Sequence, residues 1–289
     1  MANTIVLAKK YISLLDEVYQ AESKTAILDS DASLTRAGAN TNEIVIPKML
    51  LDGLGDYDRS GGYPNGDVSL TWETVKFNFD RGRKFSIDAM DDEESMNLAF
   101  GSLAGEFERT KVIPELDAFR FAMYASRAKN TVSADLTMGS DVITALRAAS
   151  VAMDNAEVPA EGRILFITPD IKGLVDDMNT NVSREVLKKF SSIVEVPQVR
   201  FYSAIEQLDG KSVGEEKGGF KKAAEGKDMN FLVVHKTALL QYTKHAIPKI
   251  IDPAQNQNAD AYIFAYRSYG LADVYTNKNS AIYAHTATT

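Results

Sequence analysis

The sequence predicts an α+β fold, bordering on mixed α/β, and three patterns lead to that prediction. Apolar and polar residues alternate from Val68 onward, which indicates β-strands in the first third of the chain. Apolar residues then recur every three to four positions between residues 92 and 127, which indicates a long helix. After residue 141, short helical and strand patterns are interleaved, and no repeat of about 20 to 50 residues is present.

Composition limits the class of protein before any motif is considered. The 289 residues are 45% hydrophobic and 25% charged, which suffices for one large domain or two smaller ones. Cysteine is absent, so disulfides, cysteine-based zinc sites and cysteine nucleophiles are excluded. The formal net charge of −8 argues against a sequence-specific reader of DNA. The chain has no run of about 18 apolar residues and no basic region at Met1–Thr4, so we expect neither a membrane span nor a secretory signal.

The first 42 residues are predicted to form a peripheral arm. Residues 30–42 are mostly small and polar, which indicates a loop or an extended segment. A plain surface helix followed by a linker is an equally good interpretation. The helix is predicted from apolar residues that fall on one side, namely Ile5, Val6, Tyr11, Ile12, Leu15, Val18 and Tyr19.

Residues 44–90 are predicted to be β-structure. Ile44–Pro47 forms a short strand, in which Pro47 fits an edge better than a central position because it lacks an N–H group. Asp52–Asp67 is rich in glycine and therefore in turns. The alternating pattern then runs from Val68 to Phe79.

The segment Asp80–Arg83 is predicted to be a polar turn, after which Phe85 and Ile87 resume the alternation. We therefore expect a long two-stranded hairpin with aromatic residues on both faces. Because an isolated hairpin is marginally stable in water, it needs a partner surface in this chain or in another.

Residues 92–127 are predicted to be a long helix. Asp91–Glu94 lies at its start, where negative charge complements the helix dipole. Pro114 is expected to kink or divide the helix. Arg120 and Arg127 place positive charge near its end. One buried face is predicted from Met96, Phe100, Leu103 and Phe107, continued by Leu116, Phe119 and Met123.

The remainder of the chain is predicted to alternate between helices and strands. Asp141 is expected to cap a helix that buries Val142, Leu146, Ala149 and Met153. The predicted strands are Arg163–Thr168, Val194–Tyr202 with an interruption at Pro197, Phe231–Val234, much of 239–251, and 261–283. Helices are expected over 170–178 and 183–190, and an exposed loop over Asp209–Asp228.

No catalytic, cofactor or metal motif is found. The histidines His235, His245 and His285 lack zinc-site spacing. Gly210-Lys211-Ser212 is not a phosphate-binding loop, because the glycine required five residues earlier is Ile205. No nucleophile elbow or complete dinucleotide-binding motif occurs. The acidic run at residues 91–94 is better explained as a helix start than as paired catalytic carboxylates, so we predict no cofactor, metal or catalytic residue.

Several segments, taken together and in this order, resemble a known family of structural proteins. They are Ile46–Lys48, Gly53–Tyr57, Leu70–Glu73, Asp80–Arg83, Phe85–Asp91, Val112–Asp117, Val194–Pro197 and Arg200–Tyr202. In these segments the chain resembles the major capsid proteins of tailed bacteriophages with the HK97-type fold. The resemblance spans nearly the whole chain.

The resemblance implies a division of the chain into the parts of that fold. Residues 1–42 would be the N-terminal arm, and residues 43–91 the extended loop hairpin that lies over a neighbouring subunit. Residues 92–134 would be the spine helix and peripheral domain. Residues 135–245 would form the axial domain, and residues 246–289 the closing strands of the peripheral domain.

The resemblance also implies a function in a shell and not in catalysis. Copies of the chain would assemble into pentamers and hexamers of an icosahedral phage head, in the host cytoplasm, around double-stranded DNA bound without sequence specificity. We expect a portal protein as a partner. Because no scaffolding extension precedes Met1, we expect either a separate scaffolding protein, which a start at Met1 favours, or a processed form of the chain. Alternatives are an encapsulin-type cargo container and a cytoplasmic α/β enzyme with an unrecognised site.

Candidate inter-subunit residues lie in the predicted hairpin. Large aromatic side chains are frequent in interface cores, and arginines pair with carboxylates across contacts. The same residues would alternatively pack within their own subunit. We predict no crosslink, although Lys76 and Lys84 lie in this region. The candidates are Trp72, Phe77, Phe79, Arg81, Arg83 and Phe85.

Overall fold

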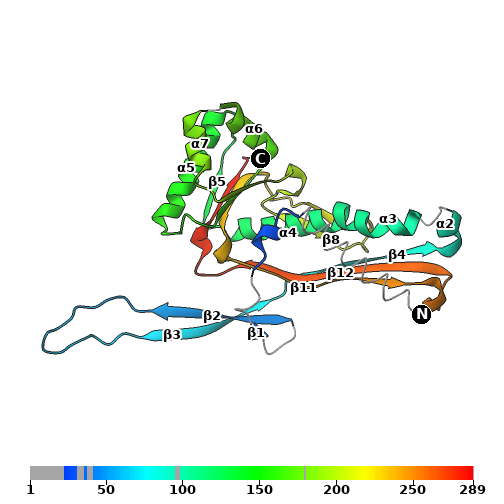
Figure 1. The fold of residues 1–289 in the computed structure, drawn as a ribbon, viewed down its shortest axis with the longest axis horizontal. Helices are drawn as coiled ribbons and strands as arrows, with labels where there is room; N and C mark the ends of the chain where they lie inside the picture. Colours follow the sequence, from blue (N-terminus) through cyan, green and yellow to red (C-terminus); the bar gives the residue numbers. More distant parts are fainter. Residues whose placement is uncertain (1–22, 31–35, 38–41, 95–97, 179, 289) are drawn as a thin grey trace.

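A computed structural model of the chain describes residues 23–30, 36–37, 42–94, 98–178 and 180–288. Two sheets with their covering helices form the body, and one long hairpin projects from it (Figure 1). The predicted N-terminal helix lies outside the described residues, as does Met96 of the predicted helical stripe. The domain boundaries given by the resemblance stay a prediction.

The first sheet has five strands and forms the centre of one half of the body. Its strand order is β5 (Asn130–Ser133), β13 (Ile282–Thr286), β10 (Met229–His235), β6 (Arg163–Ile167) and β7 (Ser192–Glu195). The pairs β5–β13 and β6–β7 are parallel, and β10 is antiparallel to both of its neighbours. Every residue of β6 and β10 is buried, because helices cover both faces, and this confirms the two strands predicted from unbroken apolar runs.

Helices α5 (Gly139–Asn155), α6 (Pro169–Met178) and α7 (Asn181–Leu187) pack on one face of this sheet (Figure 1). The predicted stripe of α5 is confirmed, since all four of its residues are fully buried. The prediction that Asp141 caps this helix is wrong. The helix begins two residues earlier at Gly139, where a Cβ atom would lie 2.3 Å from the carbonyl oxygen of Leu174. Asp141 therefore lies inside the first turn, where its negative charge complements the helix dipole.

The second sheet has three long antiparallel strands in the order β11 (Leu239–Ile251), β12 (Ala261–Val274) and β4 (Phe79–Asp88). The predicted turn at Asp80–Arg83 is therefore wrong, because all four residues pair with β12 inside β4. Gly82 fits this strand because a Cβ atom there would lie 2.8 Å from the carbonyl oxygen of Tyr266.

The projecting hairpin is made of β2 (Glu43–Leu51) and β3 (Val68–Lys76), with a short β1 (Arg36–Ala37) beside its base. The predicted pairing of β3 with the segment around Phe85 is wrong, since β3 pairs with β2 from Leu51↔Val68 to Glu43↔Lys76. The described part of β1 pairs with Ile44 and Val45 and does not reach Pro47, so the edge position expected for Pro47 stays a prediction.

A broken helix runs along one face of the second sheet. It consists of α2 (Ala89–Glu94), α3 (Leu98–Phe107), the π-helical turn η3 (Glu108–Val112) and α4 (Ile113–Arg127). Pro114 lies at the start of α4, which confirms the predicted division. A proline cannot donate an N–H group to the preceding turn, and a widened turn accommodates this loss.

The remaining elements are short. The strand predicted to reach Tyr202 ends at Glu195, because Pro197 introduces the 3-10 turn η4 (Gln198–Arg200). The predicted loop 209–228 is partly a hairpin formed by β8 (Ile205–Leu208) and β9 (Gly219–Lys222). Further 3-10 turns are η1 (Ala26–Leu28), η5 (Lys236–Ala238), η6 (Pro253–Gln255) and η7 (Asn279–Ala281).

Candidate assembly surface

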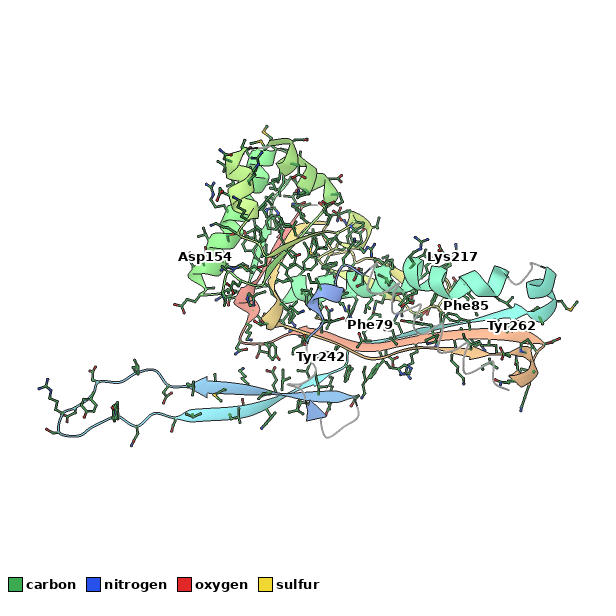
Figure 2. All side chains as sticks on the ribbon, viewed as in Figure 1. Phe79, Phe85, Asp154, Lys217, Tyr242 and Tyr262 are labelled. Atoms are coloured by element: carbon green, nitrogen blue, oxygen red, sulfur yellow. The ribbon has the colours of Figure 1, made fainter. Side chains whose placement is uncertain are left out.

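The projecting hairpin carries half of the large apolar side chains that the described residues expose. Their exposed fractions range from 45% for Trp72 to complete exposure for Leu54. Figure 2 shows the side chains pointing away from both sides of the hairpin, clear of the body. Such a continuous apolar surface is unusual on a monomeric protein and marks an interaction site. The residues are Met49, Leu50, Leu51, Leu54, Tyr57, Tyr63, Val68, Leu70 and Trp72.

Strand register places these side chains in pairs. Met49 lies directly opposite Leu70, and Leu51 lies opposite Val68, so one face of the hairpin is a ladder of apolar pairs. Leu50 lies on the other face, because successive residues of a strand point in opposite directions. Both faces therefore gain from burial against another surface.

The tip of the hairpin is ordered by its own contacts. The rings of Tyr57 and Tyr63 meet edge to face with centroids 4.9 Å apart. Asp58 and Gly62 exchange two backbone hydrogen bonds, and the Asp52 carboxylate accepts a 2.8 Å bond from the backbone N–H of Asp67. These contacts hold an acidic tip in one shape.

The base of the hairpin is packed on the body. Ile46 is buried in a cluster with Leu240 and Leu271, and the ring of Phe77 lies 4.9 Å from that of Tyr269. Lys48 donates a hydrogen bond to the hydroxyl of Thr276. The hairpin is therefore fixed at one end and exposed over the rest of its length.

The predicted aromatic interface residues differ in where they lie. Trp72 is on the projecting hairpin, whereas Phe77 packs on Tyr269 at its base. Phe79 is only 3% exposed, with its ring 5.1 Å from that of another phenylalanine on α4. Phe85 packs against Phe107 in the core between the second sheet and its helix. Phe77, Phe79 and Phe85 thus pack on other aromatic rings of the same chain.

The two predicted arginines also bind within the chain. The Nε atom of Arg81 lies 2.6 Å from the Glu115 carboxylate, and its Nη2 atom donates to the backbone carbonyls of Leu208 and Gly219. Burial raises the pKa of Glu115, an effect that Arg81 opposes. Arg83 donates to the carbonyl of Glu216 at 2.8 Å. Together the arginines fasten the β8–β9 hairpin to β4.

Sequence reasoning missed the apolar residues at and near the tip. Met49, Leu50 and Leu51 end a strand, and Leu54 lies in a glycine-rich stretch that was interpreted only as turns. The available signal was the presence of large apolar residues in a turn-rich segment, where polar residues are usual.

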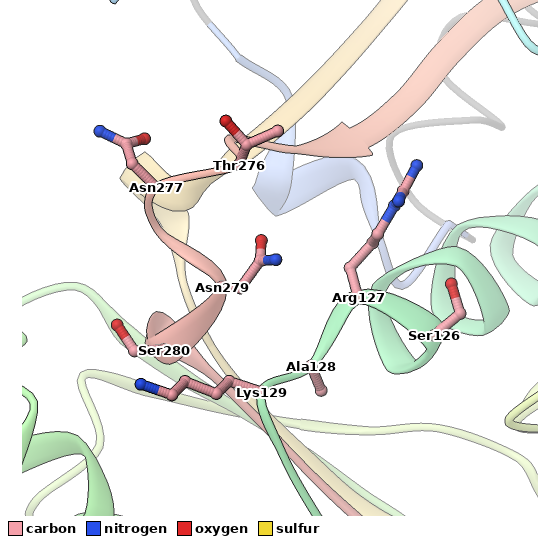
Figure 3. Close-up of a pocket in the computed structure, with 8 residues that line it drawn as sticks. All are labelled: Ser126, Arg127, Ala128, Lys129, Thr276, Asn277, Asn279 and Ser280. Carbon is pink, nitrogen blue, oxygen red and sulfur yellow. The ribbon is translucent and has the colours of Figure 1, made fainter. Parts of the chain in front are cut away.

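A polar pocket of about 510 Å³ lies where the end of α4 meets the turn before β13 (Figure 3). Arg127 at its rim is held by Asp273 at 3.1 Å. The lining groups are hydroxyls, amides and cations, so the pocket offers no acid–base pair. They belong to Ser126, Arg127, Ala128, Lys129, Thr276, Asn277, Asn279 and Ser280.

The histidines occupy separate structural positions. His235 bonds the carbonyl of Glu161 at 2.8 Å, His245 is exposed on β11, and burial lowers the pKa of His285. Among the described residues, no group of three acidic or histidine side chains could hold a metal ion. In that same part of the chain, no helix has both the length and the apolar character needed to cross a bilayer.

Comparison with known proteins places the fold. No family model and no curated protein sequence matches the chain. A structure from Gordonia phage Cozz matches with a TM-score of 0.59 and 14% identity over 93% of this chain and 87% of that one. The mature capsid of bacteriophage PhiM1 matches with a TM-score of 0.58 and 13% identity, covering 88% and 84%. The chain has the HK97-type capsid fold.

A capsid-fold particle from another source matches over a larger share of both chains. The virus-like particle from Pyrococcus furiosus has a TM-score of 0.56 and 11% identity, and the match covers 96% of this chain and 99% of that one. At these identities the likeness establishes the fold, and the α+β class predicted from the sequence is confirmed with it.

Proposed function

We propose that this chain is the structural subunit of a capsid shell and not an enzyme. The observation that carries the proposal is the hairpin, which exposes apolar side chains on both faces while its base is fixed to the body. Fully burying one such side chain contributes about 1.5–3 kcal/mol. A neighbouring copy that covers the hairpin would therefore stabilise a contact that every subunit repeats around a closed shell.

The finer form of the proposal is the major capsid protein of a tailed phage. Copies form pentamers and hexamers of an icosahedral head, assembled in the host cytoplasm with a separate scaffolding protein and a portal protein. The head encloses double-stranded DNA without reading its sequence. Support comes from the HK97-type fold, from the phage capsids among its structural neighbours, and from a net charge of −8 that does not suit a sequence reader.

A cargo container is the second candidate function. It is favoured by the match to the virus-like particle from Pyrococcus furiosus, which covers nearly all of both chains. The two candidates share the shell and differ in its contents, which would be a protein in the container and DNA in the phage head.

The test is to express the chain and examine it by size-exclusion chromatography and negative-stain electron microscopy. We expect shells, tubes, or rings of five or six subunits. Nucleic acid or protein recovered from purified particles separates the two candidates. A monomer or small oligomer at high concentration, unchanged by co-expression with the neighbouring genes, would contradict both.

A further inference from the structure

The tip of the projecting hairpin, residues 52–67, contains the only Asn-Gly pair in the chain, Asn65 followed by Gly66. In such a pair the backbone nitrogen of the glycine attacks the side-chain carbonyl carbon of the asparagine. The new carbon–nitrogen bond closes a five-membered succinimide ring while the amide nitrogen leaves as ammonia, and water then opens the ring to aspartate or isoaspartate. Glycine favours ring closure because it has no Cβ atom and a freely turning backbone.

The structure leaves both residues of the pair accessible. Each is exposed and lies between β2 and β3, outside the strands, at the end of the hairpin that points away from the body (Figure 1). Within the part of the chain that the structure describes, no hydrogen bond holds the Asn65 side chain or the Gly66 backbone N–H. The attacking nitrogen must first lose its proton, and an unprotected N–H group in an exposed loop exchanges its proton readily with water.

The shape of the tip does not depend on glycine at position 66. Gly62 in the same tip has a φ of 82°, a left-handed conformation that favours glycine. The φ of Gly66 lies outside that region, and a Cβ atom there would lie 3.7 Å from the Cβ atom of Asp52, which is an ordinary contact. Alanine therefore fits at this position, so Gly66→Ala can hinder ring closure without reshaping the tip.

Other asparagines differ from Asn65 in one of these features. Asn78 is held at both ends of its amide, since it donates to the carbonyl of Ala272 at 2.8 Å and accepts from the N–H of the same residue at 3.1 Å. Asn258 is exposed, as Asn65 is, but an alanine follows it, and the alanine Cβ atom hinders ring closure. Asn258 is thus an internal control within the same molecule.

Conversion of Asn65 would change the tip in two ways. Residues 52–67 contain four aspartates and one arginine, a net charge of −3 that one added carboxylate makes −4. Isoaspartate also lengthens the main chain just before Asp67, which closes the tip. The Asp67 N–H donates to the Asp52 carboxylate at 2.8 Å, and the Asp52 N–H donates to the Asp67 carbonyl at 3.2 Å.

We propose that Asn65 is a site of spontaneous deamidation, which adds a negative charge to the hairpin tip. The reaction consumes only water and releases ammonia, so it needs no enzyme and no partner chain. It goes beyond the shell function, because it makes the charge of the most exposed part of the hairpin depend on the age of the chain.

The test incubates the purified chain at pH 8 and at pH 6 and follows its proteolytic peptides by mass spectrometry. Asn65 should convert about tenfold faster than Asn258, and Gly66→Ala should slow its conversion about tenfold. Conversion should be slower at pH 6, because fewer backbone nitrogens lose their proton. On an ion-exchange column, the aged wild type should move to the position of Asn65→Asp, which carries the charge of the product. Both variants should melt like the wild type, since the two positions are exposed.

Two results would overturn the proposal. One is conversion at Asn65 that is no faster than at Asn258, and the other is a rate that Gly66→Ala leaves unchanged, since the reaction would then not depend on the glycine. Either result leaves the capsid proposal standing, because that proposal is decided by particle formation. A chain that deamidates at Asn65 and forms no particles would contradict the capsid proposal alone.

Discussion

At the scale of single residues, the chain contains a buried carboxylate with several hydrogen bonds, which sequence patterns did not indicate. Asp117 on α4 is completely buried. It accepts hydrogen bonds from the Ser23 hydroxyl at 2.8 Å, from the hydroxyl and backbone N–H of Thr25, and from the guanidinium of Arg200 at 3.1 Å. Arg120, which is 2% exposed, donates to the same Thr25 hydroxyl. This network fastens residues 23–30 to α4 and to the η4 turn.

Replacing Asp117 should therefore destabilise the fold strongly. Asp117→Ala leaves Arg200 and several buried donors without their acceptor, which costs about 3–5 kcal/mol. Chemical denaturation of the wild type and the variant measures this difference. Asp177→Ala, at an exposed position on α6, should change the free energy of unfolding by less than about 0.5 kcal/mol. Equal effects of the two substitutions would show that the Asp117 network is energetically unimportant.

A second prediction at this scale concerns pH. His285 is buried against the ring of Phe231, and its Nδ1 atom lies 3.0 Å from the amide nitrogen of Asn230. Burial lowers its pKa below the ordinary value of 6.5. As the pH decreases, His285 is therefore protonated in the unfolded chain at a higher pH than in the folded chain. The free energy of unfolding keeps its full value above pH 6.5 and decreases below it.

The comparison is between the wild type and His285→Gln from pH 7.5 to 5. The wild type should lose extra stability below pH 6.5, by at most about 1.4 kcal/mol per pH unit for one proton. Parallel pH profiles for the two proteins would exclude His285 as the cause.

At the scale of elements, β4 links three parts of the body. Its even-numbered residues include Asp80, which lies on the sheet face that the helices leave uncovered. Its odd-numbered residues include Arg81, which points toward α4. One guanidinium there joins a carboxylate of α4 to two carbonyls of the β8–β9 hairpin. A polar residue in β4 thus positions a hairpin that is distant in sequence.

Arg81→Met should loosen the β8–β9 hairpin. The change leaves the mostly buried Glu115 carboxylate unpaired and removes two bonds to carbonyls, at a cost of about 2 kcal/mol. Arg83→Met is the matched control, because Arg83 is exposed and makes a single carbonyl bond, so its loss should cost under about 1 kcal/mol. Amide exchange in residues 205–222 should accelerate in the first variant and much less in the second. Similar rates in both variants would contradict the role assigned to Arg81.

At the scale of the whole molecule, the chain separates a packed body from an unpacked hairpin. The body contains one hydrophobic core on each face of the first sheet. A third core lies between the second sheet and the helix that covers it. The hairpin leaves its apolar ladder exposed, which is typical of a surface that binds a partner.

Removing the ladder should abolish assembly without unfolding the body. In M49S/L51S/L70S, three exposed side chains become polar, so the melting temperature should stay within a few degrees of the wild type. Particles should disappear from electron micrographs at concentrations where the wild type forms them. The control V151S/V199S/V213S changes three exposed valines outside the hairpin and should still assemble. Particle formation by the ladder variant would show that the apolar ladder is not required for assembly.

The sequence by itself determined the elements whose signals are local. Unbroken apolar runs identified β6 and β10, the four-residue spacing identified the buried face of α5, and Pro114 identified the break before α4. These patterns succeed because burial on both sides, helical periodicity and the missing N–H group of proline act over a few neighbouring residues. Trp72 is exposed on a hairpin other than the predicted one, and its role in assembly stays a prediction.

Only the tertiary structure decided which strands pair and which aromatic residues remain exposed. Gly82 pairs with Arg267, far along the chain, so Asp80–Arg83 has the composition of a turn and the conformation of a strand. Phe79 and Phe85 share the apolar character of Trp72, yet Phe79 is buried and Phe85 half-buried against the covering helices, whereas Trp72 is 45% exposed. The physical reason is that strand pairing and burial depend on partners distant in sequence, whose positions no local pattern records.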